Sequence, residues 1–206
     1  MEILVLFDSK YGNTYALAKA IAEGAQQVDG MTARLRKPTE TTPIEVVRAD
    51  ERRSKFLDFI SQEVPEATLD DLVQCEGLAL GSPTRYGNIS PAMGNFIEST
   101  GPLWLKGTLN GKVAGVFCST STIHGGNEAT LLTMMIPLLH HGMYIVGLPF
   151  TAEAMNRSRT GGTPYGASHF AASRGDARLS DDERELAQLL GRRVAEVAVA
   201  VRTVRG

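Results

Sequence analysis

Three short segments of the chain collect hydroxyl, amide and glycine residues directly behind apolar runs. They are "DSKYGNT" (8–14), "SPTRYGN" (82–88) and "STSTIHGGNE" (119–128). The apolar runs are typical of buried parallel strands, whose carboxyl ends meet at one edge of a sheet. Ligands of open α/β sheets bind at that edge. We therefore expect the three loops to form one binding site.

The first loop has the composition of a phosphate site. Ser9 and Thr14 carry hydroxyls, Gly12 permits a turn, and an amphipathic helix over 14–28 begins where the loop ends. The first turn of a helix offers unpaired N–H groups and a partial positive charge, which suit a phosphate. An ordinary strand-to-helix turn with a Thr or Asn cap is the alternative. The loop matches neither G-x-x-x-x-G-K-[ST] nor G-x-G-x-x-G, so neither a Walker-type site nor a tightly held dinucleotide is indicated.

The second loop suits a flat ring. Its glycine-permitted turn presents backbone N–H groups, the planar Tyr86 and the guanidinium of Arg85. These groups favour a multiply hydrogen-bonding heterocycle, such as a flavin, over a sugar or a metal. The third loop could bind the opposite edge of the same ring or its ribityl chain. For any single residue of the third loop, a small-residue surface loop is the alternative.

The histidines and cysteines do not indicate a metal site. His140 and His141 are neighbours on a predicted helix and point about 100° apart, so they cannot both bind one ion. His124 and His169 lie in glycine-rich segments and are expected to be solvated. Cys75 and Cys118 lie in apolar runs without C-x-x-C spacing, as expected for reduced, buried thiols of a cytosolic protein.

Five strands are expected to position the loops. Short apolar runs predict strands at 2–7, 77–81, 113–119 and 143–150, and the alternating segment 32–37 is typical of an edge strand. Helices are expected at 14–28, 46–63, 93–98 and 128–140, and from 181 after a capping box between Ser180 and Glu183. This alternation predicts an α/β fold, a doubly wound parallel sheet with helices on both faces. Segments 38–74 and 151–179 exceed what the sheet needs and are interpreted as two insertions.

Composition sets the class of protein. The 206 residues, 43% of them hydrophobic, indicate a single domain over 1–206. A formal charge of −2 gives no basic surface for nucleic acid. The N-terminus "MEILVLF" has no basic leader, and its apolar run is too short for a signal peptide or a membrane span. We therefore expect a cytoplasmic protein.

Six motifs carry a resemblance to a known family. "SKYGNT", "GSPTRYGN", "GPLW", "FCSTSTIHGGNE", "LLHHGM" and "GGTPYGA" fall in the order and spacing of the WrbA-type flavodoxin-like NAD(P)H:quinone oxidoreductases. The resemblance covers nearly the whole chain. It implies a flavodoxin-like five-stranded fold, bound FMN, a homotetramer, and two-electron reduction of quinones by NADH or NADPH. A flavodoxin-type one-electron carrier that docks redox partners is the alternative, which the near-neutral charge and the two insertions disfavour.

The resemblance also assigns roles to residues. Those matching the FMN phosphate loop are Ser9, Lys10, Tyr11, Gly12, Asn13 and Thr14, with Tyr11 also near the nicotinamide nucleotide. Those matching the two loops around the ring are Thr84, Arg85 and Tyr86, then Ser119, Thr120, Ser121, Thr122 and Gly125. His140 matches a flavin-side histidine and Trp104 a tryptophan beside the quinone pocket. His140 or Tyr86 would donate to a quinone oxygen. Ser121 stands where the family usually has Gly, and Ile123 with His124 lengthens the third loop, so contacts there are expected to differ.

Overall fold

The computed structural model describes residues 1–172 and 177–205 of the chain. Residues 173–176, which belong to the second predicted insertion, lie outside this description. The strands form one parallel sheet in the order β2-β1-β3-β4-β5, with β6 also paired to β4. Their bounds are β1 (Glu2–Phe7), β2 (Thr32–Arg36), β3 (Gly77–Pro83), β4 (Val113–Thr120), β5 (Tyr144–Ile145) and β6 (Ala167–Phe170). The predicted α/β class is confirmed, and β2 lies at the edge, as its alternating pattern indicates.

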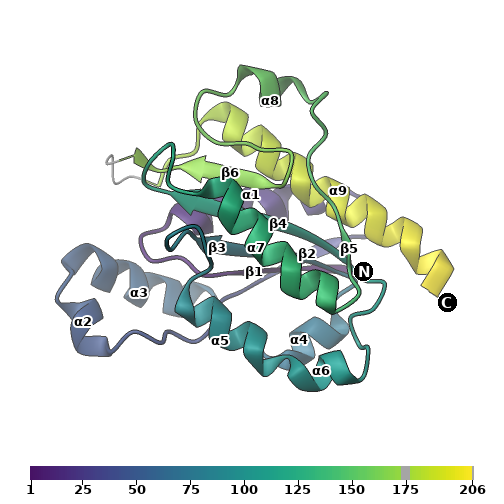
Figure 1. Cartoon of the computed structure of the whole chain (residues 1–206), viewed down its shortest axis with the longest axis horizontal. Helices are drawn as coiled ribbons and strands as arrows, with labels where there is room; N and C mark the ends of the chain where they lie inside the picture. Colours follow the sequence, from purple (N-terminus) through teal and green to yellow (C-terminus); the bar gives the residue numbers. More distant parts are fainter. Residues whose placement is uncertain (173–176, 206) are drawn as a thin grey trace.

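Helices cover both faces of the sheet (Figure 1). They are α1 (Asn13–Ala25), α2 (Ile44–Arg48), α3 (Glu51–Glu63), α4 (Leu69–Gln74), α5 (Pro91–Ser99), α6 (Gly101–Leu105), α7 (Asn127–His140), α8 (Glu153–Arg157) and α9 (Asp181–Arg205). One apolar core lies between the sheet and α1 with α9, and a second lies between the sheet and α4 to α7. Strands buried on both faces explain why β1, β3 and β4 consist of nearly continuous apolar runs.

The prediction of a continuous fifth strand over 143–150 is wrong. Only β5 forms there, pairing with Val113 and Ala114 at the start of β4. The chain then leaves the sheet before Pro149, which has no N–H for a ladder, and it returns as β6. β6 pairs with Phe117 to Thr120 at the carboxyl end of β4. The fifth position of the sheet is therefore shared, with β5 beside the amino end of β4 and β6 beside its carboxyl end. The predicted insertion at 151–179 therefore contains a strand of the sheet.

The first insertion also differs from its prediction. The helix expected over 46–63 is two helices, because Asp50 has an extended backbone and its side chain accepts from the N–H of Arg53, which begins α3. Figure 1 shows α2 and α3 projecting at one side of the sheet, near the start of α5. The capping box at the start of α9 is confirmed, since Ser180 Oγ accepts from the N–H of Glu183 and the Glu183 carboxylate accepts from the N–H of Ser180.

Candidate functional site

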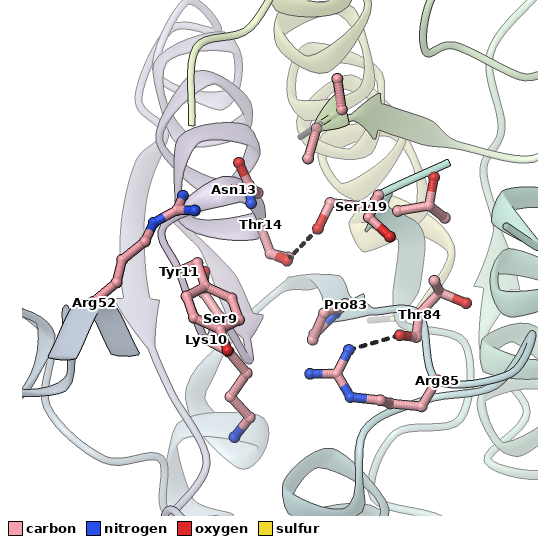
Figure 2. A pocket seen from close by; sticks show the side chains of 14 residues that line it. Ser9, Lys10, Tyr11, Asn13, Thr14, Arg52, Pro83, Thr84, Arg85 and Ser119 are labelled. Carbon is pink, nitrogen blue, oxygen red and sulfur yellow. Dashed lines mark hydrogen bonds between the residues drawn. The ribbon is translucent and has the colours of Figure 1, made fainter. Parts of the chain in front are cut away.

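The three loops meet in one cavity at the carboxyl ends of β1, β3 and β4. Its volume is about 290 Å³. Figure 2 shows the lining side chains, which come from the first loop (Ser9, Lys10, Tyr11, Asn13, Thr14), the second (Pro83, Thr84, Arg85), the third (Ser119, Thr120, Ser121), and from Arg52, Ala171 and Ala172. Among the residues that the structure describes, the lining contains three cationic residues, Lys10, Arg52 and Arg85, and no Asp or Glu, a composition that suits an anionic ligand.

The first loop leaves backbone donors at the start of α1. Gly12, with φ +94°, is the N-cap residue and has no side chain with which to cap the helix. Ser9 Oγ accepts from the N–H groups of Gly12 and Tyr15, at 3.2 and 3.3 Å. Within residues 1–172 and 177–205, no group accepts from the N–H of Asn13 or Thr14. The ordinary Thr or Asn cap is therefore ruled out, and the helix end keeps the donors that a phosphate requires.

Hydroxyl contacts join the loops to one another. Thr14 Oγ1 and Ser119 Oγ share a buried hydrogen bond of 2.9 Å. The N–H of Thr84 donates to the Ser119 carbonyl at 2.9 Å, and Thr84 Oγ1 lies 2.6 Å from Thr130 Oγ1 on α7. Because each loop is bonded to a neighbour, the cavity wall is preorganised.

The tip of the second loop is a two-residue turn. Arg85 and Asn88 exchange backbone hydrogen bonds of 2.8 and 3.0 Å, and Tyr86 (φ +52°) and Gly87 (φ +78°) lie between them, as in a type I′ turn. Tyr86 is fully exposed and lies outside the cavity lining. A bulky residue at positive φ is strained, and such strain is concentrated at functional sites.

The side chain of Lys10 is directed away from the phosphate end of the cavity (Figure 2). Its ammonium lies 2.9 and 3.1 Å from the two oxygens of Glu40 and 3.2 Å from Asp8 Oδ1. Burial alone would raise the pKa of Glu40, but hydrogen bonds from Lys10 and from the N–H of Thr42 lower it to about 2. Lys10 therefore ties the first loop to the first insertion.

The first insertion contributes a residue that the sequence analysis did not identify. Tyr11 donates its hydroxyl to Asp50 Oδ2 at 2.7 Å, and this hydrogen bond, followed by burial, raises the pKa of Tyr11. Arg52, two residues further along α3, places its guanidinium 5.2 Å from the centre of the Tyr11 ring and lines the cavity. No local pattern marks Arg52, because its position depends on how α3 folds back onto the first loop.

His140 and Trp104 are not brought to the cavity within one chain. Helix α7 begins beside the third loop and runs back, so that His140 lies exposed at its far end, close to β5, which pairs with the first residues of β4. Trp104 lies on α6, and Thr100, which precedes α6, bonds His141 Nε2 at 2.8 Å. Both residues thus lie at the amino ends of the strands.

Three further residues discussed in the sequence analysis, Thr122, Gly125 and His169, lie outside the cavity lining. Thr122 accepts from Thr120 Oγ1 and from the N–H of Gly125, so Thr122 and Gly125 shape the third loop outside the cavity lining. The expectation that His169 is solvated is wrong, because it lies buried on β6 with Nδ1 3.0 Å from Glu183 Oε2.

The cysteines match their expectation. Cys75 and Cys118 are free, buried thiols, and burial raises the pKa of Cys75 to about 11. Within the described part of the chain, no three His, Cys, Asp or Glu side chains are grouped so that they could hold a metal ion. No helix of that part is both long and apolar enough to span a bilayer.

Comparison with known proteins agrees with this geometry. A family model described as NADPH-dependent FMN reductase matches residues 1–155. An NAD(P)H dehydrogenase (quinone) of Solidesulfovibrio magneticus is 42% identical over 207 residues, covering 98% of this chain and 100% of the relative. One of Geobacter metallireducens is 41% identical with the same coverage.

Solved structures agree on the fold. A WrbA-like flavodoxin from Agrobacterium tumefaciens superposes with a TM-score of 0.63 at 21% identity, covering 97% of this chain and 98% of that one. A flavodoxin from the domain Archaea gives a TM-score of 0.62 at 20% identity, covering 97% and 99%. The chain therefore belongs to the NADPH-dependent FMN reductase family. The match to NAD(P)H dehydrogenases (quinone) confirms the resemblance of its motifs to the WrbA-type flavodoxin-like NAD(P)H:quinone oxidoreductases.

Proposed function

We propose that this chain, as a single FMN-binding domain, reduces quinones to hydroquinones with NADH or NADPH. The observation that carries the proposal is the cavity itself. There the start of α1, with the N–H groups of Asn13 and Thr14 available, meets three hydrogen-bonded loops, and no described residue of the lining is a carboxylate. Relatives 41–42% identical over nearly their full length are named NAD(P)H dehydrogenase (quinone), which supports the same activity here.

The residues present fit FMN. The N–H groups of Asn13 and Thr14 are positioned for its phosphate. The hydroxyls of Thr14 and Ser119 lie beside them, and Ser9, whose oxygen already accepts two N–H groups, keeps its own proton to donate. When bound, FMN supplies a ring that accepts hydride from a nicotinamide and delivers hydride to a quinone.

The protein's own contribution is binding and electrostatics. Pro83, Thr84 and Arg85 on one side and Thr120 with Ser121 on the other enclose the remaining length of the cavity. Arg85 is oriented by a 2.8 Å hydrogen bond from its guanidinium to the Thr84 carbonyl, which keeps a positive charge at the wall. A fixed cation stabilises negative charge that develops in the site, and it needs no reorganisation during the reaction.

We further propose a cytoplasmic homotetramer in which a second copy brings Trp104 and His140 to each cavity. Exposed apolar side chains gather on α6, on the second half of α7 and on β5, namely Trp104, Leu105, Ile136, Leu139 and Tyr144, which we call the amino-end patch. Leu105 and Leu139 are 78% and 59% exposed. Apolar groups in such numbers support a protein interface. Two reduced, buried thiols support the cytoplasm.

Steady-state kinetics test the activity. Because nicotinamide and quinone would use one cavity in turn, initial rates at several fixed benzoquinone concentrations should give parallel double-reciprocal lines against NADH. Purified protein loaded with FMN should lose its flavin absorbance on anaerobic addition of NADH and regain it with benzoquinone. Failure of NADH to bleach the flavin would contradict the proposed activity. Intersecting lines, with simultaneous binding of quinone and an unreactive nicotinamide analogue, would contradict the shared cavity.

A further inference from the structure

Three arginines of the α2–α3 segment differ in their partners. Arg48 donates to both oxygens of Asp58 at 2.7 and 2.8 Å. Arg53 donates to Glu40 at 3.3 Å and to Thr42 at 2.7 Å. For Arg52, by contrast, the described residues contain no ion-pair partner, although its guanidinium lines the cavity. An arginine with no described ion-pair partner, in a wall whose described residues include no carboxylate, is placed to bind an anion.

The position of Arg52 is set by a chain of contacts. Asp50 begins α3 by accepting from the N–H of Arg53 at 3.0 Å, and its second oxygen accepts from the Tyr11 hydroxyl at 2.7 Å. The Tyr11 ring and the first turn of α3 are thereby held against each other. Arg52 lies on that turn and over that ring. Because a guanidinium stacked on an aromatic ring keeps its N–H groups free at the edge, Arg52 can still donate to a ligand.

Among residues 1–172 and 177–205, no other side-chain cation is available at the phosphate end of the cavity. Lys10 is part of the first loop, but its ammonium is bound by Glu40 and Asp8. Arg85 lies across the cavity, on the second loop, where it donates to Thr84. Figure 2 shows the Arg52 guanidinium on the Asn13 side of the cavity, where α1 begins. The helix start supplies N–H donors and a partial positive charge, and within the described part of the chain Arg52 is the side chain placed to add a full positive charge to a phosphate dianion there.

We propose that Arg52, contributed by the first insertion, binds the phosphate held at the start of α1. If the chain binds FMN as proposed, this group is the 5′-phosphate of FMN. The 2′-phosphate of NADPH has the same chemistry, so the two sources must be separated by experiment. The insertion would then add a positive charge to the cofactor site.

The test compares two ligands that differ only in the phosphate. Dissociation constants for FMN and for riboflavin are measured by flavin fluorescence on the apoprotein of the full chain, for the wild type, Arg52→Gln and Arg52→Lys. Lys55→Gln is the matched control, because it removes one exposed positive charge from the same helix, outside the cavity lining. Loss of a charged hydrogen bond predicts about tenfold to a hundredfold weaker FMN binding by Arg52→Gln.

The other measurements fix the cause. Riboflavin affinity should be the same in all variants, Lys55→Gln should bind FMN like the wild type, and Arg52→Lys, which keeps the charge but not the planar stack, should fall between wild type and Arg52→Gln. Equal losses for FMN and riboflavin would make Arg52 a structural residue and overturn the inference. An unchanged FMN affinity, with KM raised for NADPH but not for NADH, would also overturn it and assign Arg52 to the 2′-phosphate. A wild-type protein that binds neither flavin would instead contradict the proposed function.

Discussion

The two ends of the parallel sheet present opposite surfaces. At the carboxyl end, loops from β1, β3 and β4 are joined by hydrogen bonds such as that between Thr14 and Ser119, and they enclose a polar cavity. At the amino end, the hydrogen bond between Thr100 and His141 links the start of α6 to the end of α7, two helices that carry exposed apolar side chains of the amino-end patch.

Strand and helix direction explain the difference. In this fold each crossover helix begins near the carboxyl end of a strand, so the N–H groups and positive partial charge of α1 lie at that edge. Helix C-termini, such as that of α7, lie at the opposite edge and carry no such donors. An anionic ligand is therefore attracted to the carboxyl end, and we assign the amino end to the proposed contact between copies of the chain. Variants at the two ends should separate ligand binding from assembly.

The largest effect is expected at the amino end. Leu139→Glu places a charge in the amino-end patch and should dissociate the proposed tetramer, because a buried, unpaired carboxylate is costly at an interface. Loss of positioning by the second copy should lower quinone turnover by about a hundredfold or more. Static light scattering at several dilutions would report the mass, and benzoquinone reduction the activity.

Val199→Glu is the matched control, since it adds the same charge at an exposed apolar position of α9, outside the patch. It should leave mass and turnover unchanged. FMN binding by Leu139→Glu should weaken less than tenfold, because the phosphate donors belong to a single chain. Full turnover by a stable monomer would contradict the assignment of the amino end to assembly.

The second effect is expected at the carboxyl end. Thr14→Ala removes one hydroxyl from the phosphate site and breaks the contact with Ser119, so FMN binding should weaken about tenfold to a hundredfold. The molecular mass should not change. Riboflavin affinity should also stay the same, because riboflavin lacks the phosphate, and both constants can be measured by fluorescence titration.

Thr133→Ala serves as the control for Thr14→Ala, since its hydroxyl only returns to the Thr130 carbonyl within α7. Equal weakening of FMN and riboflavin by Thr14→Ala would place the phosphate elsewhere.

Local patterns predicted the carboxyl end better than the rest of the fold. The apolar runs of β1, β3 and β4 and the helix period of α1 are properties of adjacent residues, and they were sufficient to bring three loops to one edge. The prediction of the fifth strand was wrong because β5 has only two residues, and because β6, Ala167–Phe170, includes the polar residues Ser168 and His169. His169 is buried only because Glu183, 14 residues further on, reaches its ring.

Local sequence patterns could not predict contacts between segments that are distant in the sequence. Arg52 joins the cavity through the fold of α3 onto Tyr11, and Lys10 leaves the phosphate end because Glu40 of the first insertion binds it. Asp50 could have indicated the break between α2 and α3, since Asp is a favoured cap, but its second bond, to Tyr11, has no local sign.

The smallest effect expected is that of low pH on the free energy of unfolding. Groups at the two ends of the sheet should lower it in different pH ranges. The pKa of Glu40 is lowered from its ordinary value of 4.5 to about 2, so its bond to Lys10 stabilises the fold fully above about pH 4.5, and this stability is lost as pH falls toward 2. Burial, then the neighbouring His140, lowers the pKa of His141 from 6.5. Protonation of the unfolded chain should therefore begin to destabilise the amino end already as pH falls through about 6.5.

Urea unfolding of Glu40→Gln and His141→Gln against the wild type, from pH 8 to pH 3, separates the two ranges. The difference between wild type and His141→Gln should begin to shrink as pH falls through about 6.5, and that for Glu40→Gln only as pH falls below about 4.5. The sign follows from proton binding, because in both cases the unfolded chain binds the proton more tightly, so stability must rise with pH across each range. Coincident pH profiles for the two variants would show that one shared network, rather than two separate ends, responds to acid. Distinct profiles would show that the contacts of Glu40 and His141 respond to acid independently.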